Sequence, residues 1–133
     1  PTSGTFTYTA LGGTLPTDSS GAIGTATSTA TLTANFTAMT VNTSVNATVG
    51  ANTWAASANN IPILNGSTFT AEKINGVGNL TVTSSLAGTT SGKLNGIFTG
   101  NATGTSGGAM LGYSMNVGGA AGTTMQGVTA FKK

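Results

Sequence analysis

The sequence predicts an all-β fold: a single antiparallel meander of eight or nine strands that closes into a small, most simply eight-stranded, β-barrel. Three observations predict it. Apolar side chains alternate with polar ones at the strand period of two from one end of the chain to the other. Short turn signals rich in Gly and Asn separate the alternating segments. The length of 133 residues suits one domain, so we expect a single barrel domain over residues 1–133.

The first half of the chain shows the alternation most clearly. Aromatic and apolar residues between threonines predict a first strand over residues 5–11, and a longer loop over 12–24 follows it. Two more strands are predicted over 30–36 and 39–49, each with one apolar face and one face of Thr, Ser and Asn. The apolar parity changes between these two strands, so we predict a tight hairpin at Thr37-Ala38.

The second half continues the pattern with stronger turn signals. Asn65-Gly66 and Asn75-Gly76 are turn signals, because both residues of such pairs adopt positive φ readily. Pro62 cannot donate to a ladder and is therefore excluded from a central strand. Further alternating segments predict strands around Trp54 to Ala58, Phe69 to Ala71, Leu80 to Leu86, Leu94 to Phe98, Ala109 to Val117 and about Met125 to Phe131, the last two joined by a loop over 118–122.

Closure is the arrangement that we expect for this sheet. A twisted meander of so many strands can curl onto itself, and closure removes edges that the chain has almost no charge to protect. The predicted inward residues are mostly Ala, Val, Leu and Met, which suits a filled interior. A sandwich of two sheets is the alternative architecture.

The composition excludes several classes of function. Charged residues make up 5% of the chain, against roughly a quarter in ordinary soluble domains, and none of them is Arg. Nucleic-acid binding needs clustered basic residues, so we predict no nucleic-acid partner. There is no Cys for a disulfide or a zinc site, and no apolar run of about 18 residues that could form a transmembrane helix. A membrane-spanning barrel needs strands of about 10 alternating residues with aromatic girdles, and most strands predicted here are too short and too polar, so we expect a chain that does not span a membrane. This balance favours an extracellular or bacterial cell-surface location.

The chemistry of catalysis is limited by the residue types that are absent. With no His and no Cys, the chain has no Ser-His or Cys-His pair, no imidazole base and no ordinary transition-metal site. Asp18 lies in a Pro-Thr-Asp-Ser-Ser-Gly segment and is predicted to cap a turn, and Glu72 is predicted to form a surface charge pair with Lys73. A Ser-Lys dyad through Lys73 or Lys93 stays open. We therefore predict that the chain is not an enzyme, with no catalytic, cofactor-binding or metal-binding residues and no cofactor.

The aromatic residues and the Asn-X-Ser/Thr triplets each allow two interpretations. Trp54, Tyr8, Tyr113 and the five Phe could stack on a sugar or a porphyrin, but their spacing is in phase with the other apolar residues and predicts that most lie in the core. The triplets matter only in a host that glycosylates, and a chain this rich in Asn and Thr contains them by chance. They begin at Asn35, Asn42, Asn46, Asn65, Asn79 and Asn101.

Short Gly-based motifs carry a resemblance to a known family. The segment 92–102 (GKLNGIFTGNA), Gly107-Gly108 and the final segment 127–133 (GVTAFKK) resemble the closing hairpins of the eight-stranded barrel of transferrin-binding-protein-B-like surface lipoproteins. Residues 11–18 together with Ala34 to Phe36 and Val41 are similar to the barrel attached to some bacterial FecR-domain envelope proteins. The resemblance implies an eight-stranded barrel displayed outside a bacterium, with a binding or architectural role. The charged loops of the iron-acquiring members are missing here.

These observations lead to one functional hypothesis and one alternative. We predict a non-catalytic extracellular or cell-surface structural module of a bacterium that associates with copies of itself, as a fibre, matrix or adhesin subunit, because so few charges oppose close packing. The first strand is the segment expected to pair with a neighbour, since the long loop after it lets it swing out. The alternative is a binding module of the transferrin-binding-protein-B-like type that holds a host protein or a small apolar ligand such as haem, whose iron would need Tyr or Met as ligand.

Overall fold

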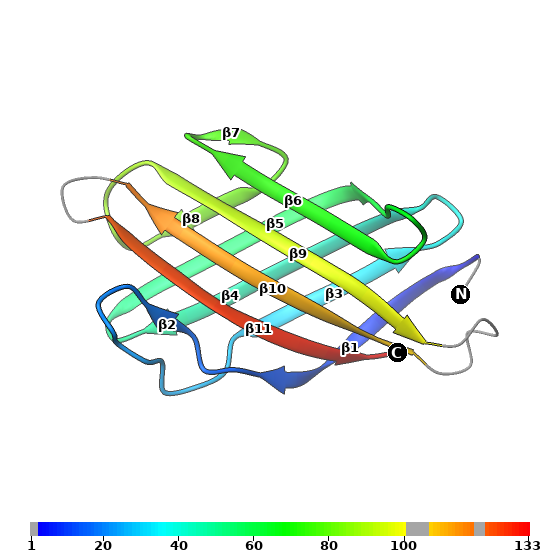
Figure 1. Cartoon of the computed structure of the whole chain (residues 1–133), viewed down its shortest axis with the longest axis horizontal. Helices are drawn as coiled ribbons and strands as arrows, with labels where there is room; N and C mark the ends of the chain where they lie inside the picture. Colours follow the sequence, from blue (N-terminus) through cyan, green and yellow to red (C-terminus); the bar gives the residue numbers. More distant parts are fainter. Residues whose placement is uncertain (1–2, 101–106, 119–121) are drawn as a thin grey trace.

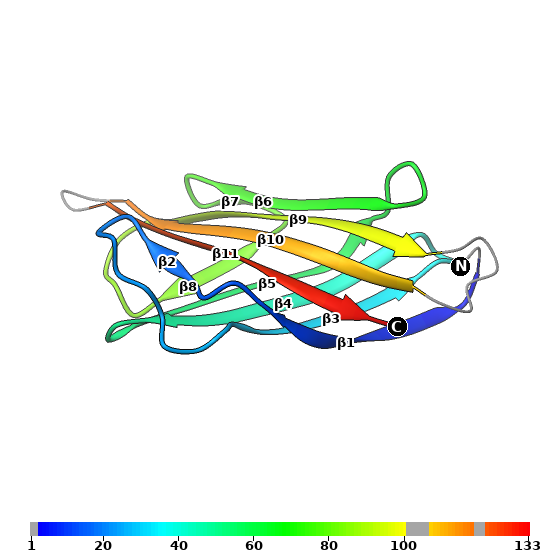
Figure 2. The same ribbon diagram turned by 60° about the horizontal axis from the view of Figure 1, so that its bottom comes forward.

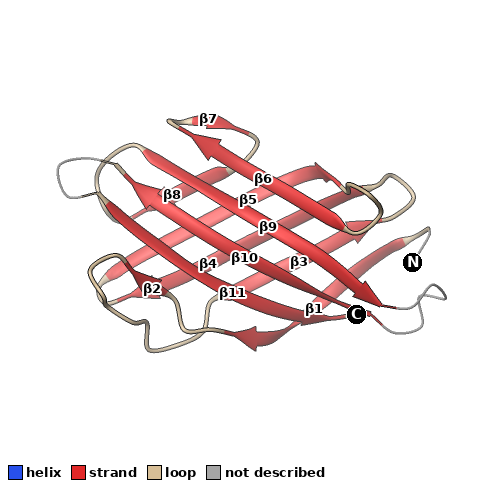
Figure 3. Cartoon of the chain, in the orientation of Figure 1, coloured by secondary structure: helices blue, strands red, loops and turns tan. Residues whose placement is uncertain are grey.

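The computed structural model describes residues 3–100, 107–118 and 122–133, and this part of the chain consists of strands, turns and loops (Figure 3). Most of the predicted Gly-rich loop over 118–122 and the triplet at Asn101 lie outside the described residues. Among the described residues, no helix is long and apolar enough to cross a membrane. The eleven strands are β1 (Thr5–Gly13), β2 (Thr17–Asp18), β3 (Thr29–Asn35), β4 (Thr40–Val49), β5 (Asn52–Pro62), β6 (Thr68–Ile74), β7 (Val77–Gly78), β8 (Thr81–Ser84), β9 (Thr90–Gly100), β10 (Gly107–Val117) and β11 (Thr123–Lys132).

All strand pairs are antiparallel and belong to one sheet that curls into a nearly closed barrel (Figures 1 and 2). The strand order is β7-β6-β9-β10-β11-β1-β3-β4-β5-β8, and β2 pairs with β11. Two walls can be distinguished: β3, β4, β5 and β8 form the first, and β6, β9, β10 and β11 form the second. β1 joins the walls, because Thr5 to Tyr8 pair with β3 and Thr9 to Gly13 pair with β11.

The prediction of an all-β antiparallel barrel is confirmed, but the predicted count of eight or nine strands is wrong. The two additional strands, β2 and β7, contain two residues each. Two residues are too few to show a periodicity, so the sequence pattern gives no signal for them. The order also departs from a simple meander, because β8 pairs with β5 while β6 pairs with β9. Among the described strands, no ladder joins β5 to β6 or β8 to β9, and the barrel stays open along this seam.

The predicted turns are present where the structure describes them. The chain reverses over residues 36–39, as predicted from the change of parity, with Met39 at φ 54°. Asn75 and Gly76 have φ of 49° and 86°, which is the conformation that matches the right-handed twist of the flanking strands. β5 continues past the predicted strand end at Ala58 and ends at Pro62. Within this extension Asn60 has φ 55°, next to a register shift against β4.

Alternate residues of the strands fill the interior, as expected for a packed barrel. One end is filled mainly by rings: Tyr8, Phe36 and Phe69 each lie 5.2 to 5.4 Å from the ring centroid of Phe98. The start of β1 and the end of β11 lie at this end (Figures 1 and 2). There the Nζ of Lys133 sits 3.8 Å from the ring centroid of Phe6. The prediction that most aromatic residues belong to the core is confirmed.

Candidate functional site

Asp18 is part of a turn, as predicted from its sequence neighbours. Its Oδ1 accepts hydrogen bonds from the Ser20 hydroxyl at 2.6 Å, from the Ser20 backbone N–H at 2.9 Å and from the Ala22 backbone N–H at 3.1 Å. The bond from the Ser20 hydroxyl, supported by the two backbone N–H groups, holds the pKa of this carboxyl below its usual value. The carboxylate therefore organises the loop that leads to β3.

Glu72 has a different partner from the one predicted. Its Oε2 lies 3.6 Å from the Nζ of Lys93 on the neighbouring strand β9, because the ladder places these two residues opposite each other. Adjacent residues of a strand point to opposite faces, which separates Glu72 from Lys73. Lys73 instead donates to the Thr90 hydroxyl at 2.8 Å.

The two carboxylates do not face a common cleft. Asp18 on β2 and Glu72 on β6 are separated by β11, β10 and β9, which corresponds to about 19 Å along the sheet at the usual strand spacing. A glycosidase pair spans at most about 10 Å. Among the described residues, no three acidic, His or Cys side chains are grouped closely enough to hold a metal ion.

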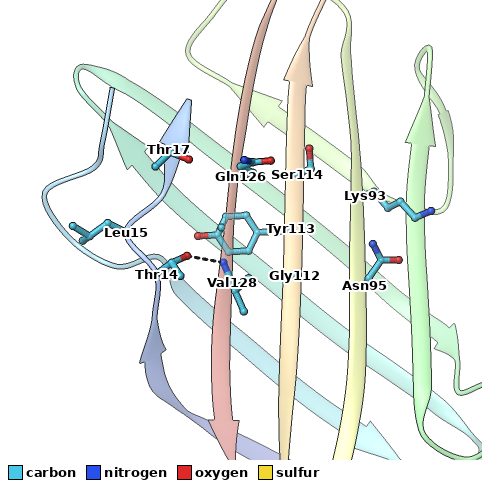
Figure 4. Close-up of a pocket in the computed structure, with 11 residues that line it drawn as sticks. Thr14, Leu15, Thr17, Lys93, Asn95, Gly112, Tyr113, Ser114, Gln126 and Val128 are labelled. Carbon is cyan, nitrogen blue, oxygen red and sulfur yellow. Dashed lines mark hydrogen bonds between the residues drawn. The ribbon is translucent and has the colours of Figure 1, made fainter. Parts of the chain in front are cut away.

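An outer groove lies on the second wall (Figure 4). Its floor is the outward surface of β9, β10 and β11, and its volume is about 560 Å³. The segment between β1 and β2 forms one side through Thr14 and Leu15, while Lys93 and Asn95 form the other. Thr14 is fixed against β11, because its backbone N–H donates to the Val128 carbonyl and its hydroxyl accepts from the Val128 N–H, both at 3.0 Å.

The groove exists because Gly112 has no side chain. A Cβ at this position would have one neighbour within 4 Å, the Asn95 carbonyl oxygen at 3.8 Å, which is an ordinary van der Waals distance, so a side chain could be placed above Gly112 without a clash at its Cβ. Ser114 and Gln126 supply uncharged polar groups at one end of the groove, and Val128 and Leu15 supply apolar surface. The chemistry available is therefore hydrogen bonding and apolar contact, with one cation, Lys93, already paired to Glu72.

Two interior glycines shape the wall beneath the groove. The Tyr113 side chain occupies the space that a Cβ of Gly127 would need, and the Phe69 ring occupies the space that a Cβ of Gly96 would need. Each aromatic residue is directly opposite its glycine on the neighbouring strand. Tyr113 is buried, and its hydroxyl shares a hydrogen bond with the Ser28 hydroxyl. Burial raises the pKa of Tyr113. The tyrosine therefore anchors the loop before β3 and leaves its hydroxyl unavailable in the groove.

For the candidate Ser-Lys dyad, the structure places a serine next to Lys93 but not in the environment that catalysis requires. Ser114 is directly opposite Lys93 in the β9–β10 ladder, and both line the outer groove. A lysine that acts as a base must lose its water shell, whereas the Lys93 side chain is 51% exposed and paired with Glu72. Lys93 therefore lacks the desolvated, unpaired state that a Ser-Lys dyad requires.

A row of exposed apolar side chains crosses the second wall beside the groove. Met110 on β10 is opposite Ile97 on β9 and Ala130 on β11, and Leu11 lies at the bulge of β1 next to Ala130. Leu11, Met110 and Ile97 are exposed by 61%, 51% and 45%. We call Leu11, Ile97, Met110 and Ala130 the apolar row. Sequence reasoning missed it, although Ile97 and Met110 are out of phase with the buried residues of their strands, which is a readable signal.

Comparisons with known proteins found no match: no family model, no curated protein and no solved structure matches this chain.

Proposed function

We propose that this chain is a non-catalytic structural module of a bacterial cell surface or extracellular matrix, and that it assembles with copies of itself. The observation that carries the proposal is the apolar row on the second wall. Exposed apolar surface that is continuous across neighbouring strands is typical of contact surfaces between proteins. A second copy of the chain is the occupant to which we commit, because the charge distribution permits two copies to approach.

The charged residues are few and all lie away from the first wall. The strands β3, β4, β5 and β8 contain no charged residue, and Glu72 and Lys93 on the second wall neutralise each other. Like-charge repulsion between identical surfaces is therefore weak. A module exposed to its surroundings at high local concentration can pack closely under these conditions, and this supports the structural role.

Other properties support the extracellular and non-catalytic parts of the proposal. The outer face of the first wall is hydrated by Thr, Ser and Asn rather than by charge, and the chain has no Cys that could be oxidised. The separation of Asp18 from Glu72 and the pairing of Lys93 offer no general acid or base at the outer groove. Assay against a panel of hydrolase substrates checks this part, and turnover that depends on Lys93 or Ser114 would contradict it.

The test of self-association uses the purified chain over a range of concentrations. Light scattering after size-exclusion chromatography is expected to show a mass that rises with concentration, and electron microscopy is expected to show regular assemblies. A mass that stays at that of one chain at the highest concentration, with no assemblies in the images, would overturn the proposal.

The outer groove favours a second candidate, a surface binding module like the transferrin-binding-protein-B-like barrels. A search by mass spectrometry for a co-purifying ligand tests it, and a Soret band tests for haem. A Gly112→Leu variant would fill the groove without touching the core, so it should abolish capture of any ligand found in the groove. Retention of that ligand by the variant would place binding elsewhere.

A further inference from the structure

We infer that self-association runs through exchange of the first strand: residues 5–14 of one copy occupy the place of the same residues in another copy. The inference rests on the proposed function and adds to it the step that joins two copies; the apolar row, to which Leu11 of β1 belongs, stays part of their contact. The position of β1 in the barrel provides the first argument. It is the strand that joins the two walls, pairing with β3 through its first half and with β11 through its second half (Figures 1 and 2). If β1 leaves, β3 and β11 each present a free edge.

The side chains hold β1 in the barrel only weakly. Of its nine residues, Tyr8 alone is buried, whereas β4 and β10, of similar length, each bury five. Phe6 is partly buried, and Leu11 is exposed. Backbone hydrogen bonds therefore provide most of the attachment, and another copy of the same strand can provide identical bonds. Exchange of an element between copies costs little, because the strand forms the same interactions in the other barrel as in its own.

The chain after β1 offers a defined pivot at Leu15. Pro16 is buried, its carbonyl accepts a hydrogen bond from the Gly24 N–H at 2.7 Å, and the next two residues pair with β11. Residues 16–18 are thus held in place. A residue before proline favours extended backbone, so Leu15 can link the detached residues 5–14 to the barrel in an extended conformation. The connection after β1 is therefore short, since β1 ends at Gly13 and β2 begins at Thr17, and the long free loop expected from the sequence is not present there. Short hinge connections also favour exchange between copies.

The site between β3 and β11 that β1 would leave matches the side chains of β1. It offers the Phe36 ring to Phe6, with centroids 6.1 Å apart, and the Phe98 ring to Tyr8, with centroids 5.4 Å apart. The Thr33 hydroxyl meets that of Thr7 at 3.5 Å. β1 itself carries no charge, so entry of a strand from another copy brings no charged group into the slot.

Cysteine crosslinking tests the exchange against a background that contains no natural Cys. Thr7 and Thr33 are directly opposite each other in the β1–β3 ladder, and opposed residues have Cα atoms about 4.5 to 5.5 Å apart, which a disulfide can span. Thr7→Cys and Thr33→Cys variants with tags of different size are unfolded, refolded together and oxidised. We expect a covalent heterodimer on a non-reducing gel. The control pairs Thr7→Cys with Thr48→Cys, which is exposed on β4, and should crosslink about tenfold less.

A double variant, Thr7→Cys with Thr33→Cys, provides the second arm. Oxidation should lock β1 into its own barrel and abolish assembly, and reduction should restore it, which also shows that the variant folds. Assembly of the wild-type chain without a 7–33 crosslink above the control, together with normal assembly of the oxidised double variant, would overturn strand exchange and leave the proposed function standing. Failure of the wild-type chain to assemble at all would overturn the proposed function itself.

Discussion

The two walls of the barrel bury the same kind of core but present different outer faces. The first wall, β3, β4, β5 and β8, exposes Thr, Ser and Asn, and the hydroxyls of Thr and Ser bond across strands, as Thr31 Oγ1 does with Ser44 Oγ at 2.7 Å. The second wall, β6, β9, β10 and β11, carries the Glu72–Lys93 pair, the apolar row and the groove over Gly112. Hydroxyls keep a sheet face hydrated without charge. The features suited to recognition are thus concentrated on the second wall.

The largest effect should come from the core that both walls share. Leu32 on β3 and Leu111 on β10 are fully buried, one on each wall. Replacement of either by Ala removes apolar contacts and leaves a cavity, so each variant should lose about 2 to 5 kcal/mol in the free energy of unfolding. Urea denaturation followed by tryptophan fluorescence measures the loss. If one variant lost less than about 1 kcal/mol while the other lost the full amount, the walls would not share one core.

Two glycines of the second wall should respond in opposite ways to the same change. At Gly96 a Cβ collides with the Phe69 ring, so Gly96→Ala should cost about 1 to 3 kcal/mol. At Gly112 the outer space is open, so Gly112→Ala should change the free energy of unfolding by less than about 0.5 kcal/mol. Denaturation of both variants under the same conditions provides the measurement. Equal losses in the free energy of unfolding would contradict the assignment of Gly96 to the inner face and Gly112 to the outer face of the wall.

Charges placed on the two outer faces should affect assembly differently. Ile97→Lys with Met110→Lys puts like charges into the apolar row, and we expect the association constant to fall by at least about tenfold, which corresponds to about 1.4 kcal/mol. Thr31→Lys with Asn46→Lys adds the same charges to exposed positions of the first wall and should change it less. Light scattering across concentrations compares the two variants. A stronger effect of the second pair would assign the contact to the first wall.

The smallest effect should come from Asp18 and depend on pH. Its pKa is lower in the folded chain than the value of about 3.9 in an unfolded one, so the unfolded state binds more protons below that pH. The stabilisation is present above about pH 4 and is lost as the pH falls through the folded pKa. Asp18→Asn should remove this acid dependence, as measured by thermal unfolding in a pH series. If the unfolding temperature of the variant fell at low pH as much as that of the wild-type chain, the pH dependence would belong to another group.

Particular residues show how far sequence reasoning reached. The change of apolar parity between Phe36 and Met39 and the Asn75-Gly76 pair both located turns correctly, because each is a local signal. Asp18 was assigned to a turn by its neighbours Ser19 and Ser20. The Glu72–Lys93 pair was missed, since it depends on which strand lies next to β6. The outer groove and the apolar row were missed for the same reason.

The sequence by itself determined an all-β chain with one apolar side to each strand, few charges and no residues for imidazole or thiol chemistry, because periodicity and composition are properties of neighbouring residues. Only the tertiary structure decided that β6 pairs with β9, that β1 spans both walls and that the barrel stays open at one seam. Pairing between distant strands is set by how the whole sheet packs and closes, and a period of two fits many such pairings equally well.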